Sequence, residues 1–441
     1  MKYFFYCIAV IALLTVSCNN NLKKKQENAD MEDVVKTPVK ENVNLPAPYD
    51  TKSVMVFSDV IGWPQGKIPL APDGFTVSKL ADGLLNPRWI YEGPNGDLFV
   101  AESATEPGII GKIKSVVSGQ AKSGASKSAN RITIIRDANH DGVPELKQVF
   151  LSGLHQPFGM LILNNQFYVG NTDGVMVFPY KTGQTQITEP GKMIVALPAG
   201  GYNNHWTRNI MTNRDHSKIY VAVGSSSNVA EHGMEYEKRR ACILQMNPNG
   251  TGEKIYASGL RNPQGMAWAT GTNTLWTAVN ERDLLGDDLV PDYLTSVKKD
   301  GFYGWPYSYW GQHEDPRMKD KQNPALVQKA IVPDVSMGAH TASLGLAFDE
   351  NNKFPGRYAG GAFIGQHGSW NRSTLSGYQV AFVPFTKGKP TGKMEPFLTG
   401  FIADSAKQKV YGRPVGVCIT RQNMMLVADD VSNTIWMVKP K

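Results

Sequence analysis

The segment SGLRNPQGMAW, residues 258–268, joins an apolar run to polar residues at its start. Residues 265–268 have the character of a short buried strand that follows a proline, and Arg261 and Asn262 stand just before that proline. A second apolar run, LWTAVN at 275–280, follows after a turn-like stretch. Together the two runs predict a β-hairpin whose first strand begins beside an arginine and an asparagine.

This pair of segments recurs six times along the chain. The second strands share an apolar run that ends in a small or polar pair: LFVAES (98–103), FYVGNT (167–172), IYVAVG (219–224), LWTAVN (275–280), AFIGQH (362–367) and MLVADD (425–430). The segments that precede them are LLNPRWI, LHQPFGM, NNHWTRNI, LRNPQGM, HTASLGL and GRPVGV. Such self-similarity predicts an all-β fold, a six-bladed β-propeller.

Further apolar runs predict outer strands for these blades: RITIIRD, GVMVFPY, ACILQMN, YQVAFVP and TIWMVKP. The repeat spacing varies, and we expect the fifth repeat to carry a long insertion at about 281–338. A closed ring of sheets buries most strand edges, which explains how a long all-β chain stays soluble.

Composition fits this class of fold. The chain has 441 residues, of which 41% are hydrophobic and 19% charged, enough to bury a large core. The net charge of +7 comes from scattered Lys and Arg, so we expect no nucleic-acid partner. Cys242 and Cys418 lie in apolar runs without a CxxC pattern, which favours buried thiols over metal or haem attachment.

The first residues predict export. Met1 and Lys2 precede an apolar run at 3–16 that is too short to span a membrane, and TVSC then resembles a lipobox ending at Cys18. The fit is imperfect, because Thr15 stands where leucine is usual, so simple cleavage without a lipid stays open. We expect a signal peptide at 1–18, lipid attachment at Cys18, a flexible polar tether at 19–46, and the propeller at 47–441. The chain would then be a periplasmic or outer-membrane-anchored lipoprotein that meets the membrane through its lipid.

Polar residues occupy the same place in successive repeats. In a propeller the inner strands all begin at one end, so residues just before them should form a ring there. The members of this ring are His155, His205, Arg261, Thr341, Asn86, Gln156, Trp206, Asn262 and Arg413. Arginine forks suit carboxylates or phosphates, and histidine can act as a base. The alternative is that these side chains bind loop carbonyls and hold the blades together.

The same residues carry a family resemblance. SGLRNPQGMAW, NERDLLGDDLVPDYLTSVKKDGFYGWPYSYWGQ, GAFIGQHGSWNRSTLSGYQVAFVPF and GRPVGVCI resemble the bacterial sorbosone dehydrogenase family, which is related to the soluble quinoprotein glucose and aldose sugar dehydrogenases. The resemblance runs from about Gly74 to the C-terminus. It implies a six-bladed propeller that binds pyrroloquinoline quinone (PQQ) and Ca²⁺ and oxidises a sugar, an aldehyde sugar or a polyol. The electron acceptor, a cytochrome or a quinone, is left open.

The resemblance also implies roles for single residues. His205 matches the catalytic histidine and would be the general base, and Arg261 with Asn262 matches the pair that contacts the quinone. Arg372 and Arg413 fall where the relatives have basic PQQ ligands. His155 or Gln156 lies near a glutamine that approaches the cofactor. The calcium ligands would be the main-chain carbonyls of Glu281 and Arg282, in a loop that differs from that of the relatives.

Two other segments leave alternatives open. DANHDG, residues 137–142, begins like a calcium loop but lacks a glutamate at the twelfth place, so a solvated turn is equally compatible. GFYGWPYSYWG, residues 301–311, suits either the wall of a substrate cleft or the cap of a blade.

Two rival functions fit the same fold. Six-bladed propellers also host calcium-dependent hydrolases such as lactonases, whose metal needs several converging carboxylates or amides. A non-catalytic propeller that binds carbohydrate or protein is the other rival. The predicted ring is richer in Arg and His than in carboxylates, which favours the dehydrogenase, although fold alone cannot choose.

Overall fold

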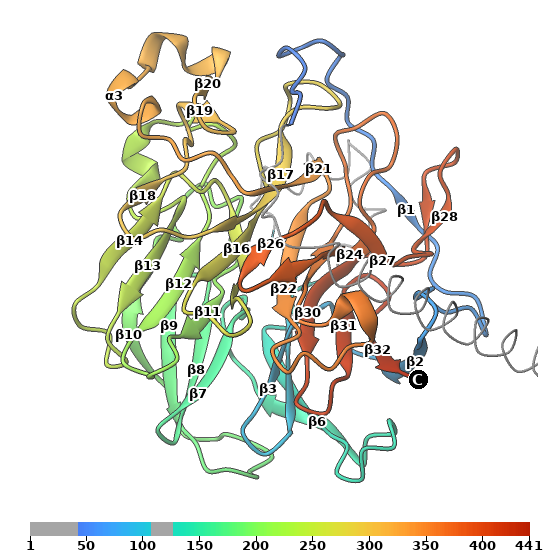
Figure 1. The fold of residues 1–441 in the computed structure, drawn as a ribbon. Helices are drawn as coiled ribbons and strands as arrows, with labels where there is room; N and C mark the ends of the chain where they lie inside the picture. The colour runs from blue at the N-terminus through green and yellow to red at the C-terminus, as the bar shows by residue number, and fades with distance from the viewer. Residues whose placement is uncertain (1–42, 107–126) are drawn as a thin grey trace, which may run out of the picture. The chain divides into compact units, whose positions relative to one another are not determined.

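The computed structural model describes residues 43–106 and 127–441, and the regular structure of this part is almost entirely β-strand (Figure 1). The predicted signal peptide, Cys18 and nearly all of the predicted tether lie outside the described residues. The packed chain begins slightly before residue 47, because Val43 and Leu45 already contact a hydrophobic core. In the described part, no helix has the length and apolar character needed to cross a membrane.

Six antiparallel sheets of four strands follow one another along the described chain. The first contains β3 (Pro87–Glu92), β4 (Leu98–Glu102), β5 (Arg131–Arg136) and β6 (Leu146–Leu151). The second contains β7 (Met160–Leu163), β8 (Gln166–Asn171), β9 (Gly174–Pro179) and β10 (Lys192–Ala196). The third contains β11 (Ile210–Thr212), β12 (Ile219–Val223), β13 (Cys242–Met246) and β14 (Lys254–Ser258), extended by the parallel strand β18 (Gly301–Phe302).

The other three sheets complete the set. The fourth contains β15 (Pro263–Trp268), β16 (Leu275–Val279), β17 (Pro291–Ser296) and β21 (Val335–Ala339). The fifth contains β22 (Ser343–Phe348), β23 (Ala362–Gln366), β24 (Gln379–Val383) and β27 (Glu395–Leu398). The sixth contains β30 (Pro414–Ile419), β31 (Met425–Asp429), β32 (Thr434–Pro440) and β2 (Phe75–Ala81). Because β2 precedes the first sheet in sequence, it joins the two ends of the folded chain in one sheet.

The inner strands contact each other in a closed order, β3, β30, β22, β15, β11 and β7. The order closes because the Ile162 main-chain N–H on β7 donates to the Tyr91 hydroxyl on β3 at 3.0 Å. This is the topology of a six-bladed β-propeller, and the predicted fold class is confirmed. The six predicted second strands are β4, β8, β12, β16, β23 and β31, and each follows an inner strand.

Small residues let the inner strands approach. A Cβ on Gly265 of β15 would lie 2.5 Å from the Leu346 nitrogen on β22, and one on Gly345 of β22 would lie 2.3 Å from the Val415 oxygen on β30. Between β3 and the second sheet, large side chains pack instead of glycines: the ring centres of Trp89 and Phe158 lie 5.0 Å apart. Buried side chains of neighbouring sheets then share clusters, for example Val175 and Leu161 with Val221 and Leu244.

The predicted insertion at 281–338 needs correction. The range contains β17 and most of β21, the outer strands of the fourth sheet, so the true excursion lies between them and belongs to the fourth repeat, not to the fifth. This excursion carries β18, the hairpin β19 (Ser308–Tyr309) and β20 (His313–Glu314), the 3₁₀ helix η3 (Pro316–Lys321) and α3 (Pro324–Val327), visible at the upper left of Figure 1. Its aromatic segment caps a blade, because Tyr303, Trp305, Tyr309 and Trp310 are all buried.

The remaining elements are short. They are β1 (Asp59–Val60), β28 (Ile402–Asp404), β29 (Lys409–Val410), β25 (Phe385–Thr386), β26 (Lys389–Pro390), η2 (Met234–Glu237) and η4 (Gly356–Tyr358). β1 pairs with β29 as part of a strap that also reaches other loops: Tyr49 N–H donates to Leu285 O at 2.8 Å, and Trp63 Nε1 donates to Asp429 Oδ2 at 2.9 Å. Cys242 is buried and Cys418 partly buried, both as free thiols.

Candidate active site

Inner strands begin, and second strands end, at the same end of the sheets. Strand register shows this directly, since Pro263 pairs with Val279, Ser343 with Gln366 and Pro414 with Asp429. We call this end the polar face. The loops gathered there include residues 203–208, 225–228, 280–283, 340–342, 367–371 and 429–430. The other members of the ring predicted from the sequence lie in further segments that precede inner strands, at 86, 155–156, 261–262 and 413.

His205 lies partly buried on the polar face before β11. Its Nδ1 lies 2.8 Å from the Ser225 carbonyl oxygen and 3.0 Å from Ser225 Oγ. A carbonyl oxygen can only accept, so we assign the ring proton to Nδ1 and the lone pair to Nε2. None of the hydrogen bonds among the described residues uses Nε2. His205 is therefore held as a neutral imidazole with its basic nitrogen available.

The surroundings of His205 keep it neutral. Burial lowers its pKa, and the charge of Arg261 lowers the pKa further, to about 3. Ser225 connects the two residues, because its main-chain N–H donates to the Arg261 carbonyl oxygen at 2.8 Å. The structure thus brings together the predicted base and the predicted arginine, and the direction of the shift is the expected one.

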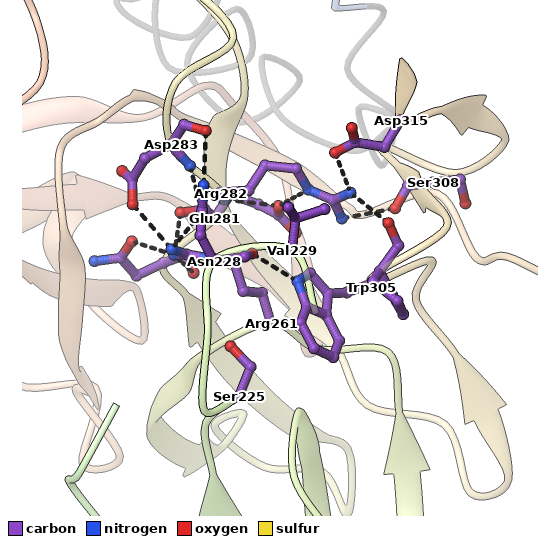
Figure 2. A network of polar contacts seen from close by, with 12 residues as sticks. Ser225, Asn228, Val229, Arg261, Glu281, Arg282, Asp283, Trp305, Ser308 and Asp315 are labelled. Atoms are coloured by element: carbon purple, nitrogen blue, oxygen red, sulfur yellow. Dashed lines mark hydrogen bonds and ion pairs between the residues drawn. The ribbon is translucent and has the colours of Figure 1, made fainter. Parts of the chain in front are cut away.

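Arg261 is almost fully buried, and its guanidinium is surrounded by protein oxygens (Figure 2). Nε donates to the Asn228 carbonyl at 3.1 Å, while Nη2 donates to Asn228 Oδ1 at 2.8 Å and to Asp283 Oδ2 at 2.9 Å. Nη1 donates to the carbonyl oxygens of Asn280, at 3.3 Å, and of Glu281. We predicted that the Arg261 guanidinium faces a ligand. It instead donates to residues of two loops, 225–228 and 280–283, and so links them.

The side chain of Asn262 lies next to His205. A Cβ on Gly224 would lie 2.4 Å from Asn262 Oδ1 and 2.5 Å from His205 Cβ, so these two side chains meet over a glycine. Asn262 Oδ1 accepts from Gln264 Nε2 at 3.3 Å, and its Nδ2 donates to no protein oxygen among the described residues. Asn262 therefore offers a free amide donor beside His205.

Asp283 is the carboxylate that forms an ion pair with Arg261. Its Oδ1 accepts from Asn371 Nδ2 at 2.8 Å, and His340 Nδ1 lies 3.8 Å from the same oxygen. Burial by itself would raise the pKa of Asp283, but Arg261 and His340 outweigh burial, and the pKa is lowered. Asp283 therefore stays ionised and balances the charge of Arg261.

Arg282 and Glu281 form a buried ion pair instead of an obvious calcium site. Arg282 is fully buried and donates to Glu281 Oε2 at 2.9 Å, to Asp315 Oδ2 at 3.0 Å and to Ser308 O at 2.7 Å (Figure 2). The Glu281 carbonyl, predicted to bind calcium, already accepts from the Arg261 guanidinium. A cation at this oxygen would have to displace that positive group, so the geometry does not fit the ion as the loop stands.

A second cationic cluster lies on the same face, between the first, fifth and sixth sheets. Arg88 Nη1 donates to Asp430 Oδ2 at 2.5 Å, and the Arg88 guanidinium lies 5.5 Å from the Trp206 ring centre. His367 Nε2 also contacts Asp430, at 2.9 Å. Arg413 donates to the carbonyl oxygens of His367 at 2.9 Å and of Gly368 at 3.0 Å.

Two nitrogen atoms of this cluster have no hydrogen-bond partner among the described residues. Arg88 Nε is buried and lacks a hydrogen bond in the part of the chain that the structure describes, and Arg413 Nη1 donates to no described residue. An unsatisfied buried donor is costly unless a ligand supplies the acceptor. The cluster therefore has positive hydrogen-bonding groups that no described residue uses.

Three predicted site residues lie in other surroundings. Arg372 donates to the Asp287 carbonyl at 3.1 Å and pairs with Asp288 at 2.6 Å, and its neighbour Asn371 is the one that reaches Asp283. His155 is half-exposed and lies 3.0 Å from Asp173. Gln156 is buried, and its Nε2 donates to the Ala104 carbonyl at 2.9 Å, which ties the second sheet to the first.

The sequence reasoning missed several residues of the site: Arg88, Asn228, Asp283, His340, His367, Asn371 and Asp430. Four of them lay within the repeat segments, at positions that the comparison did not use: Arg88, His340, His367 and Asp430. For Arg88 the sequence did contain a signal, because a charged residue stands inside the otherwise apolar inner strand of LLNPRWI.

Comparison with known proteins decides the family. The model of the family described as TrAA12-like matches residues 69–301 and 303–441. The chain belongs to the TrAA12-like family. Among curated relatives, the chain is 28% identical over 303 residues to an uncharacterized protein of Borreliella burgdorferi, covering 65% of this chain and 76% of that protein. It is 21% identical over 338 residues to quinoprotein glucose dehydrogenase B of Acinetobacter calcoaceticus, covering 66% of each.

Solved structures share the fold of this TrAA12-like chain. The holo form of the pyranose dehydrogenase PQQ domain of Coprinopsis cinerea has a TM-score of 0.67 at 19% identity, over 87% of this chain and 100% of that one. The calcium structure of the Trichoderma reesei AA12 enzyme has a TM-score of 0.68 at 17% identity, over 89% and 100%. The finer resemblance to sorbosone dehydrogenases stays a prediction.

Proposed function

We propose that this TrAA12-like protein is a PQQ-dependent dehydrogenase that oxidises a sugar, an aldehyde sugar of the sorbosone kind or a polyol. The observation that carries the proposal is His205, fixed as a neutral base with Nε2 free, beside Asn262 and close enough to Arg261 for its charge to lower the pKa of the imidazole. The names of the relatives support the cofactor and the substrate class, since they include a quinoprotein glucose dehydrogenase and a PQQ domain.

The residues present fit PQQ. The cofactor is a flat tricarboxylate with an ortho-quinone, and when bound it supplies the acceptor for a hydride. Arg88 Nη2 and Arg413 Nη1 donate to no described residue and are free for carboxylates, and the Asn262 amide can donate to a quinone oxygen. Arg261 acts indirectly in this arrangement, because its guanidinium already donates to Asn228 and Asp283 and its positive charge lowers the pKa of His205.

His205 would remove the proton of the substrate hydroxyl. Nδ1 donates to the Ser225 carbonyl, which fixes the ring, while Nε2 accepts the proton as the carbon gives up hydride. A pKa of about 3 makes the imidazole neutral but weakly basic. An anionic ligand near Arg261 would offset that charge and raise the pKa of His205 towards the working pH.

Calcium remains part of the proposal, supported by the calcium structure of the Trichoderma reesei enzyme. If the ion binds at Glu281 and Arg282, the Glu281 carbonyl must exchange its Arg261 contact for it. The calcium-dependent hydrolase is less well supported, because among residues 43–106 and 127–441 no three His, Cys, Asp or Glu side chains gather around one point. A non-catalytic binding propeller would not need the free base.

The deciding experiment is reconstitution. PQQ and Ca²⁺ are added to the purified apo-protein, and dye reduction is followed across a panel of aldoses, aldehyde sugars and polyols, with lactone hydrolysis in parallel. Sugar-dependent dye reduction that requires PQQ supports the proposal. Lactone hydrolysis without PQQ, or binding of sugar without any turnover, would replace it by one of the rivals.

We also propose that the chain is an exported lipoprotein anchored through Cys18, with a cytochrome or a quinone as its electron acceptor. The support is the N-terminal sequence alone. Replacing Cys18 by alanine should release the protein from membranes into the periplasmic fraction, followed by fractionation and immunoblotting. Unchanged membrane association of Cys18→Ala would reject the lipid anchor.

A further inference from the structure

The loop between β5 and β6 has an ordered set of oxygen ligands. In DANHDG, oxygen-bearing side chains stand at Asp137, Asn139 and Asp141, and Gly142 follows with φ at 94°. Asp137 Oδ2 accepts from Gly142 N–H at 2.9 Å, and Asn139 Oδ1 accepts from Asp141 N–H at 2.9 Å. These bonds curl the chain around the three side chains.

One carboxylate oxygen in this loop has no donor. Asp137 is only 9% exposed, and its Oδ1 is buried without a hydrogen-bond partner in the described part of the chain. The other oxygen of the same carboxylate bonds to Gly142 across the loop, so the group faces the loop interior. A buried carboxylate oxygen without a partner is unfavourable, and a cation is the partner that suits its charge.

We propose that this loop binds a Ca²⁺ ion. The carboxylates of Asp137 and Asp141 and the amide oxygen of Asn139 are its side-chain ligands, and the Val143 carbonyl and the Glu145 carboxylate complete the set. All five donors are oxygens, which selects a hard cation. Calcium fits better than magnesium, because it tolerates six to eight ligands in irregular geometry, whereas magnesium demands a near-ideal octahedron and keeps its waters.

The other contacts of the loop set the expected affinity. Glu145 Oε2 accepts from Ala138 N–H at 2.7 Å, Asp141 Oδ1 accepts from Val143 N–H at 2.7 Å, and Asp141 Oδ2 accepts from Asn139 Nδ2 at 3.1 Å. As the loop stands, the carboxylates of Asp137, Asp141 and Glu145 do not surround one point, so some of these bonds must rearrange when the ion binds. Lys439 Nζ also lies near Gly142, 3.4 Å from the place of a Cβ, and repels a cation. Both effects weaken binding, so we expect a dissociation constant of about 10⁻⁴–10⁻³ M, as in extracellular modules.

The site is independent of the proposed dehydrogenase function. β4 ends and β5 begins on the polar face, so the loop after β5 lies at the opposite end of the first sheet. Met437 of β32 packs on Gly142, since its Cε lies 2.7 Å from the place of a Cβ. An ion in this loop would therefore stiffen the junction between the first and sixth sheets.

The test is hydrogen exchange by mass spectrometry on the full chain without PQQ, with CaCl₂ or MgCl₂ added. We expect calcium to slow exchange in peptides covering residues 137–148 at least several-fold, half-maximally at about 10⁻⁴–10⁻³ M. Asp137→Asn and Asp141→Asn should lose the effect, while both keep an oxygen for the main-chain N–H. Asp215→Asn is the matched control, because Asp215 also caps a turn through the Ser217 N–H at 3.0 Å. Asp215→Asn should respond like the wild type.

Three results would overturn the proposal. They are no slowing in the wild type, equal slowing in both loop variants, and an equal effect of magnesium at the same concentration. Hydrogen exchange of β5 and β6 without calcium shows whether each variant folds. If one variant does not fold, the wild-type result still tests the proposal. None of these outcomes depends on PQQ, so failure here and failure of the dehydrogenase proposal are distinguishable.

Discussion

His205 is held as a base by a single carbonyl oxygen. Because Ser225 O fixes the proton on Nδ1, replacement by glutamine keeps the bulk and a hydrogen bond but removes the basic nitrogen. We expect His205→Gln to lower the rate of quinone reduction by about 10²–10⁴-fold and to change PQQ affinity little. Stopped-flow reduction by an active sugar measures the rate, and absorbance titration measures the affinity. Near-normal reduction in His205→Gln would move the assignment to His155, whose His155→Gln variant is the control.

The arginines of the polar face should differ in their effect on the cofactor. A charge-assisted hydrogen bond contributes about 1.5–3 kcal/mol, and every 1.4 kcal/mol is tenfold in affinity. Arg88→Ala and Arg413→Ala should each weaken PQQ binding by roughly ten- to a hundredfold, because these side chains have free donors. Arg372→Ala should change it less, since Arg372 pairs with Asp288. Absorbance titration with PQQ compares the three variants. An equal loss of PQQ affinity in all three would show that Arg372 is also a PQQ ligand.

Arg261 should matter first for stability. Its removal leaves Asp283 as a poorly solvated charge and several carbonyl oxygens without donors. Breaking a buried pair in this way costs about 3–5 kcal/mol. Arg372→Ala breaks a more exposed pair and should cost at most about 1 kcal/mol. Denaturant unfolding of both variants checks the contrast, and a cost for Arg261→Ala as small as that for Arg372→Ala would show that the network is dispensable.

At the scale of the strands, glycine controls how closely neighbouring blades approach. A Cβ on Gly265 would meet the main chain of β22 at 2.5 Å, and a main chain cannot rotate away as a side chain can. We expect Gly265→Ala to destabilise the protein by at least about 1–3 kcal/mol. Gly200→Ala is the matched control, because no atom lies within 4 Å of its Cβ position, and it should cost little. Equal unfolding curves for the two variants would show that the inner strands can separate without penalty.

At the scale of the whole molecule, His205 links stability to pH. Its folded pKa of about 3 lies below the ordinary value of 6.5, so between these values the unfolded chain holds a proton that the native chain does not. The contribution of His205 to stability therefore falls as the pH drops below 6.5, by at most about 1.4 kcal/mol per pH unit. We expect His205→Gln to gain stability relative to the wild type between pH 7 and pH 4.5.

Thermal melts across this pH range provide the measurement. The difference in Tm between His205→Gln and the wild type should grow steadily as the pH falls. His216→Asn removes an exposed histidine from a turn and should give a curve parallel to the wild type. Parallel curves for His205→Gln as well would mean that His205 is protonated in the native protein at mildly acidic pH.

The sequence by itself determined the blades and the place of the ring. Apolar runs and turns are local patterns, so the six repeated hairpins and five of the six third strands were readable, as were His205 and Arg261 at the starts of their strands. The insertion was misplaced because β17 and β21 are separated by an excursion whose two ends pair only in the folded sheet. Repeat position shows which side chains share one end of the sheets, but it does not show what each one binds.

Only the tertiary structure decided those partners. Arg261 contacts Asn228 and Asp283, which belong to loops after β12 and β16. These loops meet because the third and fourth sheets are neighbours in the closed ring. Likewise the path of one loop brings Asn371 to Asp283 while Arg372 pairs with Asp288. Side-chain direction in an irregular loop depends on contacts between distant segments, and no local pattern in the sequence encodes those contacts.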